Sequence, residues 1–124
     1  MEPGSEFQTA YSWGAVEARR HPRYKIEVEI RVYPRNATVS RGHTVDISES
    51  GISAMLRDEV PLGEVVRLEF SLATGNVDVH AFVRQRNAFR YGFQFVEDST
   101  AQDVVGRACR QLALEQAMQS ENPA

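Results

Sequence analysis

The chain has 124 residues, of which 42% are hydrophobic and 25% charged, and its formal net charge is −3 at pH 7. These values are typical of one globular domain and exclude disordered, collagen-like and coiled-coil proteins. No apolar run reaches the about 18 residues of a membrane span, and no signal-peptide pattern is present, so we expect no membrane contact. The single cysteine, Cys109, cannot form an internal disulfide, which favours a cytoplasmic location.

Basic residues gather near the N-terminus although the chain as a whole is slightly acidic. A stretch of seven residues without an acid contains Arg19, Arg20, Arg23 and Lys25. Arginine binds phosphate in a bidentate manner and stacks on planar groups better than lysine does. This cluster in an acidic chain indicates a small anionic ligand rather than nucleic acid, and a solvated basic loop is the alternative.

The two ends of the chain are not expected to belong to the fold. Residues 1–7 contain Gly-Ser-Glu-Phe, which resembles translated cloning sites, and residues 120–124 are expected to form a tail. We therefore expect one domain over residues 8–119.

From residue 25 onward, hydrophobic and polar residues alternate in the pattern of half-buried β-strands. Turn-forming Pro, Gly, Asn and Ser residues separate six such segments. The segments cover residues 25–33, 37–47, 52–56, 66–72, 77–83 and 91–95. This pattern predicts an all-β fold, a six-stranded antiparallel barrel over residues 24–97, in which residues 86–90 are a charged connection.

After the last strand the hydrophobic spacing becomes helical. One apolar face collects Val105, Ala108, Cys109 and Leu112. Ser99 and Gln102 fit a capping box with Ser99 as the N-cap residue. We expect a C-terminal helix over residues 99–118 that covers a barrel end or an open edge, with Cys109 as a core residue.

No catalytic motif is apparent in the sequence. The three histidines, His21, His43 and His80, lack the spacing of zinc ligands, and there is no glycine-rich phosphate-binding loop. We expect a protein that is not an enzyme and that holds no metal or cofactor.

Two short polar motifs could bind a ligand. Arg19 and Arg23 form Arg-x-x-x-Arg just before the first strand, in a segment where Pro22 disfavours a helix. The second motif, Asp-x-Ser-x-x-Gly, consists of Asp46, Ser48 and Gly51.

The second motif lies at the end of the second predicted strand. If the strand continues through Ser48, Asp46 and Ser48 share one face and Ile47 points into the core. Gly51 permits a positive φ or a close approach of the backbone to a ligand.

These side chains together suit a guanine nucleotide bound without a metal. Arginine pairs with the O6/N7 edge of guanine and stacks on purines, and it also binds phosphate. The carboxylate of Asp46 can accept hydrogen bonds from guanine N1–H and N2–H, and the Ser48 hydroxyl can donate to phosphate. Taken singly, each motif is more often structural, the second as a polar turn.

The two motifs, in this order around the first strands of a six-stranded barrel, resemble the PilZ domain family. The resemblance covers residues 19–96. Softer landmarks are Leu62-Gly63, Val83-Arg84 and Tyr91-Gly92-Phe93-Gln94-Phe95. It implies a barrel that binds the bacterial second messenger cyclic di-GMP. The implied ligand residues are Arg19 and Arg23 on guanine and phosphate, Arg20 beside them, Asp46 on the guanine edge, Ser48 on phosphate, and Gly51 in the turn.

The resemblance also implies how such a protein acts. A cyclic di-GMP receptor reports its ligand through a conformational or interface change, acting on a downstream protein partner or a second copy. One alternative is a PilZ-type adaptor that binds only protein. Another is a barrel for single-stranded nucleic acid, which the negative charge and the lack of an exposed aromatic ladder disfavour.

Overall fold

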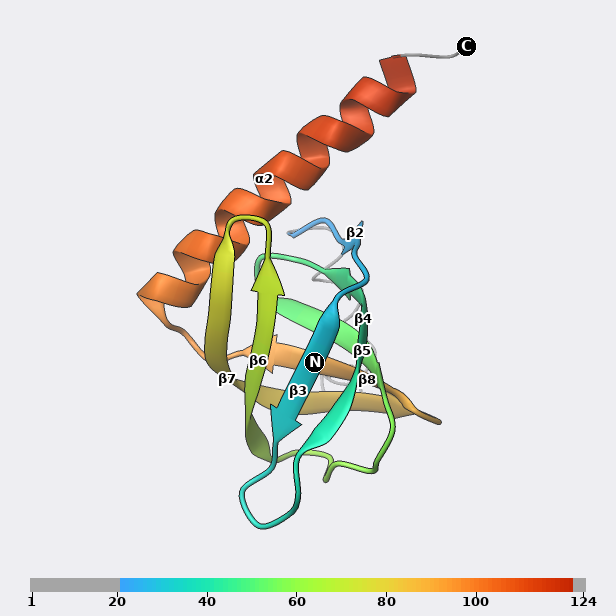
Figure 1. Ribbon diagram of the computed structural model, residues 1–124, viewed down its shortest axis with the longest axis vertical. Helices are drawn as coiled ribbons and strands as arrows, with labels where there is room; N and C mark the ends of the chain where they lie inside the picture. The colour runs from blue at the N-terminus through green and yellow to red at the C-terminus, as the bar shows by residue number, and fades with distance from the viewer. Residues whose placement is uncertain (1–20, 122–124) are drawn as a thin grey trace, which may run out of the picture.

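The computed structural model describes residues 21–121, in which the strands close into a barrel and one helix lies across it (Figure 1). The elements are β2 (Tyr24–Lys25), β3 (Glu29–Tyr33), β4 (Ser40–Ile47), β5 (Gly51–Leu56), β6 (Val65–Leu72), β7 (Gly75–Asn87), β8 (Arg90–Phe95) and α2 (Ser99–Glu121). All neighbours are antiparallel, in the closed order β3-β4-β5-β8-β7-β6 and back to β3. The six-stranded barrel is confirmed, although "all-β" is too loose for a fold with a 23-residue helix.

The first predicted strand is interrupted where it crosses a bulge in β4. Both β2 and β3 pair with β4, so they are two parts of one strand that breaks at residues 26–28. The Thr44 hydroxyl fills the break: it donates to the Ile26 carbonyl at 2.6 Å and accepts from the Val28 amide at 2.9 Å. The register against β5 shifts between Thr44 and Asp46, which is the bulge.

The expected charged connection at residues 86–90 is instead mostly strand. β7 continues to Asn87, and a two-residue loop of Ala88 and Phe89 leads into β8. The register shifts between Val83 and Gln85, and the side chains from Arg84 to Asn87 are exposed. Because none of these four residues is apolar, the alternating pattern disappears from the sequence while the hydrogen-bond ladder to β8 continues.

The core fills the barrel and extends under the helix. Its fully buried side chains include Ile30, Val32, Ile47, Ile52, Leu68, Val83, Tyr91 and Phe93. The first half of α2 closes the barrel end formed by the β6–β7 hairpin, where the Thr74 hydroxyl donates to the Val104 carbonyl at 2.8 Å. The second half of α2 projects beyond the barrel (Figure 1).

The helix cap lies one residue before the predicted one. Asp98, not Ser99, is the N-cap residue, because its Oδ1 accepts from the Ala101 amide at 3.0 Å and its carbonyl accepts from the Gln102 amide at 2.8 Å. A carboxylate is favoured at this position since it also interacts with the positive end of the helix dipole.

Candidate ligand-binding site

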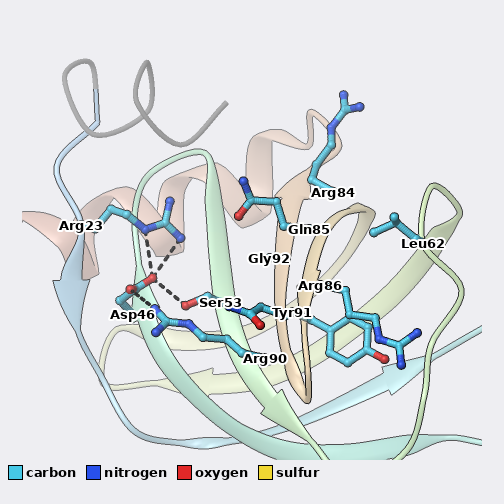
Figure 2. Close-up of a pocket in the computed structure, with 11 residues that line it drawn as sticks. Arg23, Asp46, Ser53, Leu62, Arg84, Gln85, Arg86, Arg90, Tyr91 and Gly92 are labelled. Atoms are coloured by element: carbon cyan, nitrogen blue, oxygen red, sulfur yellow. Dashed lines mark hydrogen bonds and ion pairs between the residues drawn. The ribbon is translucent and has the colours of Figure 1, made fainter. Parts of the chain in front are cut away.

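Asp46 is the centre of a polar cluster on the outer surface of the barrel (Figure 2). Its Oδ1 accepts from Arg23 Nε and Nη2, both at 2.9 Å, and from the Ser53 hydroxyl at 2.8 Å. Its Oδ2 accepts from Arg90 Nη2 at 3.2 Å. The side chains of Asp46 and Arg23 are only 18% and 21% exposed, whereas that of Arg90 is 51% exposed. Oδ1 therefore accepts three short hydrogen bonds, whereas Oδ2 accepts one longer hydrogen bond from an exposed donor.

The strand pairing brings these distant residues together. Lys25 pairs with Asp46 in the β2–β4 ladder, which places Arg23 beside the carboxylate. Ser53 is the cross-strand partner of Asp46 on β5, and Arg90 begins the next strand, β8. The structure thus brings one residue of each motif, Arg23 and Asp46, into the same cluster, and their role in ligand binding stays a prediction.

The cluster forms one wall of a cavity of about 710 Å³. The cavity is lined by Arg23, Asp46, Ser53, Leu62, Arg84, Gln85, Arg86, Asn87, Arg90, Tyr91 and Gly92. Four of these residues are arginines and one is an acid, so the lining has an excess of three positive charges. Ligand cavities in proteins commonly measure about 300–1,000 Å³, so this one suits an anionic ligand of nucleotide size.

Two arginines of β7, Arg84 and Arg86, line the cavity away from the Asp46 cluster, whereas Arg90 of β8 belongs to that cluster (Figure 2). Arg86 pairs with Glu59 at 2.5 Å, and Arg84 donates to the Gln94 side chain at 2.5 Å. The predicted site residues do not include Arg84, Arg86, Arg90 or Ser53. A sequence feature could have identified the three arginines: they fall within seven residues that contain no acid, as the basic residues of the N-terminal cluster do.

Ser48 lies in the β4–β5 turn and not on the face of Asp46. The condition for a shared face, a strand that continues through Ser48, is not met because β4 ends at Ile47; Ile47 is buried in the core as expected. The Ser48 hydroxyl is fully buried and accepts from the amides of Ser50 and Gly51, both at 3.2 Å. The Ser50 hydroxyl in turn lies 3.2 Å from His21 Nδ1. Ser48 therefore shapes the turn that faces the N-terminal segment.

Gly51 is required by the barrel itself. A Cβ at this position would lie 2.3 Å from the Phe93 carbonyl oxygen of β8. Of the two alternatives left open by the sequence, a positive φ does not occur at Gly51, since the glycines with positive φ in the described residues are Gly63 and Gly75. The close approach that Gly51 permits is to the neighbouring strand.

Other expectations have different outcomes. Arg19 and Arg20 lie outside the described residues, so their roles stay predictions. Within residues 21–121, no three His, Cys, Asp or Glu side chains lie close enough together to hold a metal ion. No helix in this range is long and apolar enough to cross a membrane.

Cys109 is buried against the barrel, as predicted for a core residue, and burial raises the pKa of its thiol to about 11.

A comparison with protein families places the chain. The sequence model of the PilZ domain matches residues 17–111, a span that contains both polar motifs and every residue of the cavity lining. The chain belongs to the PilZ domain family. A search of curated proteins finds no match for this PilZ domain.

Solved structures, among them two PilZ domains, share the fold at low sequence identity. The PilZ domain of YcgR from Escherichia coli, solved with c-di-GMP, is 16% identical; 84% of this chain covers 98% of that one with a TM-score of 0.66. The PilZ domain of CeSA from a cellulose-synthesizing bacterium is 16% identical, with 73% and 97% coverage and a TM-score of 0.60. The inhibitor of motility MotI/DgrA of Bacillus subtilis is 21% identical, and 78% of this chain covers 52% of that chain with a TM-score of 0.67.

Proposed function

We propose that this PilZ domain is a receptor for cyclic di-GMP and that binding changes its conformation or its interface with a partner. The observation that carries the proposal is the Asp46 carboxylate, which Arg23 of the first motif holds at the wall of an arginine-rich cavity. Cyclic di-GMP presents two guanine bases and two phosphates. A carboxylate accepts from the guanine N1–H and N2–H groups, and guanidinium groups bind the phosphates.

The hydrogen bonds of Asp46 suggest how the ligand enters the cluster. Guanine offers two parallel donors and pairs best with both oxygens of one carboxylate. Oδ1 already accepts three hydrogen bonds, whereas Oδ2 accepts one from Arg90, the longest of the four and from the most exposed donor. In this proposal, the base takes the place of Arg90 on Oδ2 and of one Arg23 donor on Oδ1, and the released Arg90 guanidinium binds a phosphate of the same ligand.

The remaining motif residues support the same ligand. Arg19 and Arg20 precede Arg23 by only a few residues and add positive charge for the phosphates. Ser48 and Gly51 hold the β4–β5 turn close to His21, which fixes where the N-terminal segment meets the barrel. The proposal includes no chemical step, so the output passes through a protein partner or a second copy of the chain.

The first test is calorimetry on the full chain with cyclic di-GMP and with cyclic di-AMP. We expect binding of cyclic di-GMP only, because adenine lacks the N1–H and N2–H donors that Asp46 would accept. Arg23→Ala should weaken binding by about 10- to 150-fold, the cost of a charge-assisted contact of about 1.5–3 kcal/mol. Arg41→Ala is the matched control, because Arg41 is an exposed arginine on β4 that does not line the cavity.

Two results would overturn the proposal. If the folded wild-type protein binds neither dinucleotide, the PilZ-type adaptor becomes the better interpretation. If it binds oligonucleotides with an affinity that falls steeply between two salt concentrations, the basic cavity is a nucleic-acid site.

A further inference from the structure

The second half of α2 has an apolar face that its own barrel does not cover. Val105 is buried against the barrel, whereas Leu114 and Met118 are 64% and 65% exposed. Leu114 follows Val105 by nine residues, which at about 100° per residue places the two on opposite sides of the helix. Ala117 and Met118 follow Leu114 by three and four residues, so both are its neighbours on that side of the helix. We call these three residues the outer α2 face.

In this half of α2, polar side chains lie on the side that faces the barrel and apolar side chains lie on the opposite side. Gln116 and Gln119 continue the line of Leu112 on the side that faces the barrel, and both are exposed. Because this part of α2 projects beyond the barrel, its inner side meets no core (Figure 1). An apolar outer side and a polar inner side indicate that something other than the barrel packs on this half.

The course of the chain near α2 suggests that its own N-terminal residues cover the outer α2 face. The described chain starts at His21, and Pro22 and Tyr24 line a small cavity together with Arg110 and Ala113 of α2. The first described residues therefore lie beside Ala113, the residue that precedes Leu114.

The N-terminal segment also has the length and composition to cover this face. Residues 8–18 carry three large apolar side chains, Tyr11, Trp13 and Val16. An extended chain spans about 3.3 Å per residue, so the eight steps from His21 to Trp13 reach about 26 Å. The distance along the helix from Ala113 to Met118 is only about 7.5 Å. Glu17 in the segment is opposite in charge to the exposed Arg110.

A tethered occupant also suits the small size of the patch. Two large side chains per copy fall well short of the about 1,200–2,000 Å² that a stable protein–protein interface buries. A segment of the same chain needs less contact, because the tether gives it an effective concentration in the millimolar range. We infer that residues 8–18 dock on the outer α2 face through Tyr11, Trp13 and Val16. This inference does not rest on the proposed binding of cyclic di-GMP.

Trp13 is the only tryptophan in the chain, so its fluorescence reports the docking directly. We expect the double variant Leu114→Ser/Met118→Ser to shift the emission to longer wavelength and to increase quenching by acrylamide. Leu62→Ser is the matched control, since Leu62 is an exposed leucine (59%) in the wall of the cavity, away from α2.

The outcomes distinguish the possible occupants. Unchanged emission in the double variant overturns the inference. A shift caused by Leu62→Ser places the segment in the cavity instead, and an emission that depends on protein concentration assigns the outer α2 face to a second copy. If the double variant fails to fold, hydrogen exchange on Trp13→Ala gives an independent answer: exchange over residues 113–119 should rise, and unchanged protection refutes the docking.

Discussion

The Asp46 cluster predicts a measurable cost for Asp46→Asn, which removes one charge without changing the side-chain volume. Exposed ion pairs contribute about 0–1 kcal/mol, and breaking a buried pair costs about 3–5 kcal/mol. Asp46 and Arg23 lie between these limits, with exposures of 18% and 21%. We therefore expect the free energy of unfolding to fall by about 2 kcal/mol, measured by urea denaturation.

The same substitution should impair ligand binding more than folding. The side-chain amide introduced at position 46 would present N–H donors where guanine also presents donors, so one hydrogen bond is lost and one repulsive contact is added. A loss of about 2–3 kcal/mol corresponds to about 30- to 150-fold weaker binding of cyclic di-GMP in calorimetry. The substitution should also reduce the preference for cyclic di-GMP over cyclic di-AMP.

Asp78→Asn is the matched control for both measurements. Asp78 pairs with Arg67 at 3.0 Å, but its side chain is 59% exposed and it does not line the cavity. The control should lose less than about 1 kcal/mol of stability and bind as the wild type does. Equal stability losses in the two variants would refute the argument from burial, and wild-type affinity in Asp46→Asn would refute the assignment of the guanine edge.

Three further substitutions and one modification test the packing. Gly51→Ala should destabilise the fold by about 1–3 kcal/mol in urea denaturation, because the new Cβ would clash with the Phe93 carbonyl oxygen; Gly106→Ala, where the nearest atom is 3.5 Å away, should instead gain up to about 1 kcal/mol. Asp98→Ala should cost about 1 kcal/mol through loss of the helix cap, seen as a lower midpoint in the same assay. With a pKa of about 11, the buried Cys109 thiol stays protonated at about pH 7–8, so alkylation should be slow until urea unfolds the protein; rapid labelling of the native state would contradict its burial.

The sequence predicted the barrel well wherever one strand face is buried. Alternation revealed β6, where Val66, Leu68 and Phe70 are buried in turn. It failed where hydrogen bonding continues without a buried face, as in the exposed residues from Arg84 to Asn87 of β7. It also could not show that Thr44 replaces a backbone partner at the break between β2 and β3, because that contact depends on a bulge.

The site was predicted in part for a related reason. Spacing identified Arg23 and Asp46, whose contact the strand pairing then brings about across 23 residues. Ser53 and Arg90 join the same carboxylate only because β5 lies between β4 and β8, an order that no local pattern contains. The predicted strand 37–47 ends at Ile47 as β4 does, so Ser48 lies in the turn, and the face it would have shared with Asp46 in a longer strand does not form.

Both proposals involve the segment that precedes β2. Arg23 links this segment to the cavity through Asp46, while Pro22 and Tyr24 place it against the middle of α2. A ligand that rearranges the Asp46 cluster therefore acts on the chain within two residues of its contact with the helix. If residues 8–18 cover the outer α2 face, a shift of Arg23 would change how firmly they are held there. The surface exposed by Leu114 and Met118 would then depend on the occupancy of the cavity, which would give the proposed receptor a physical route to a partner.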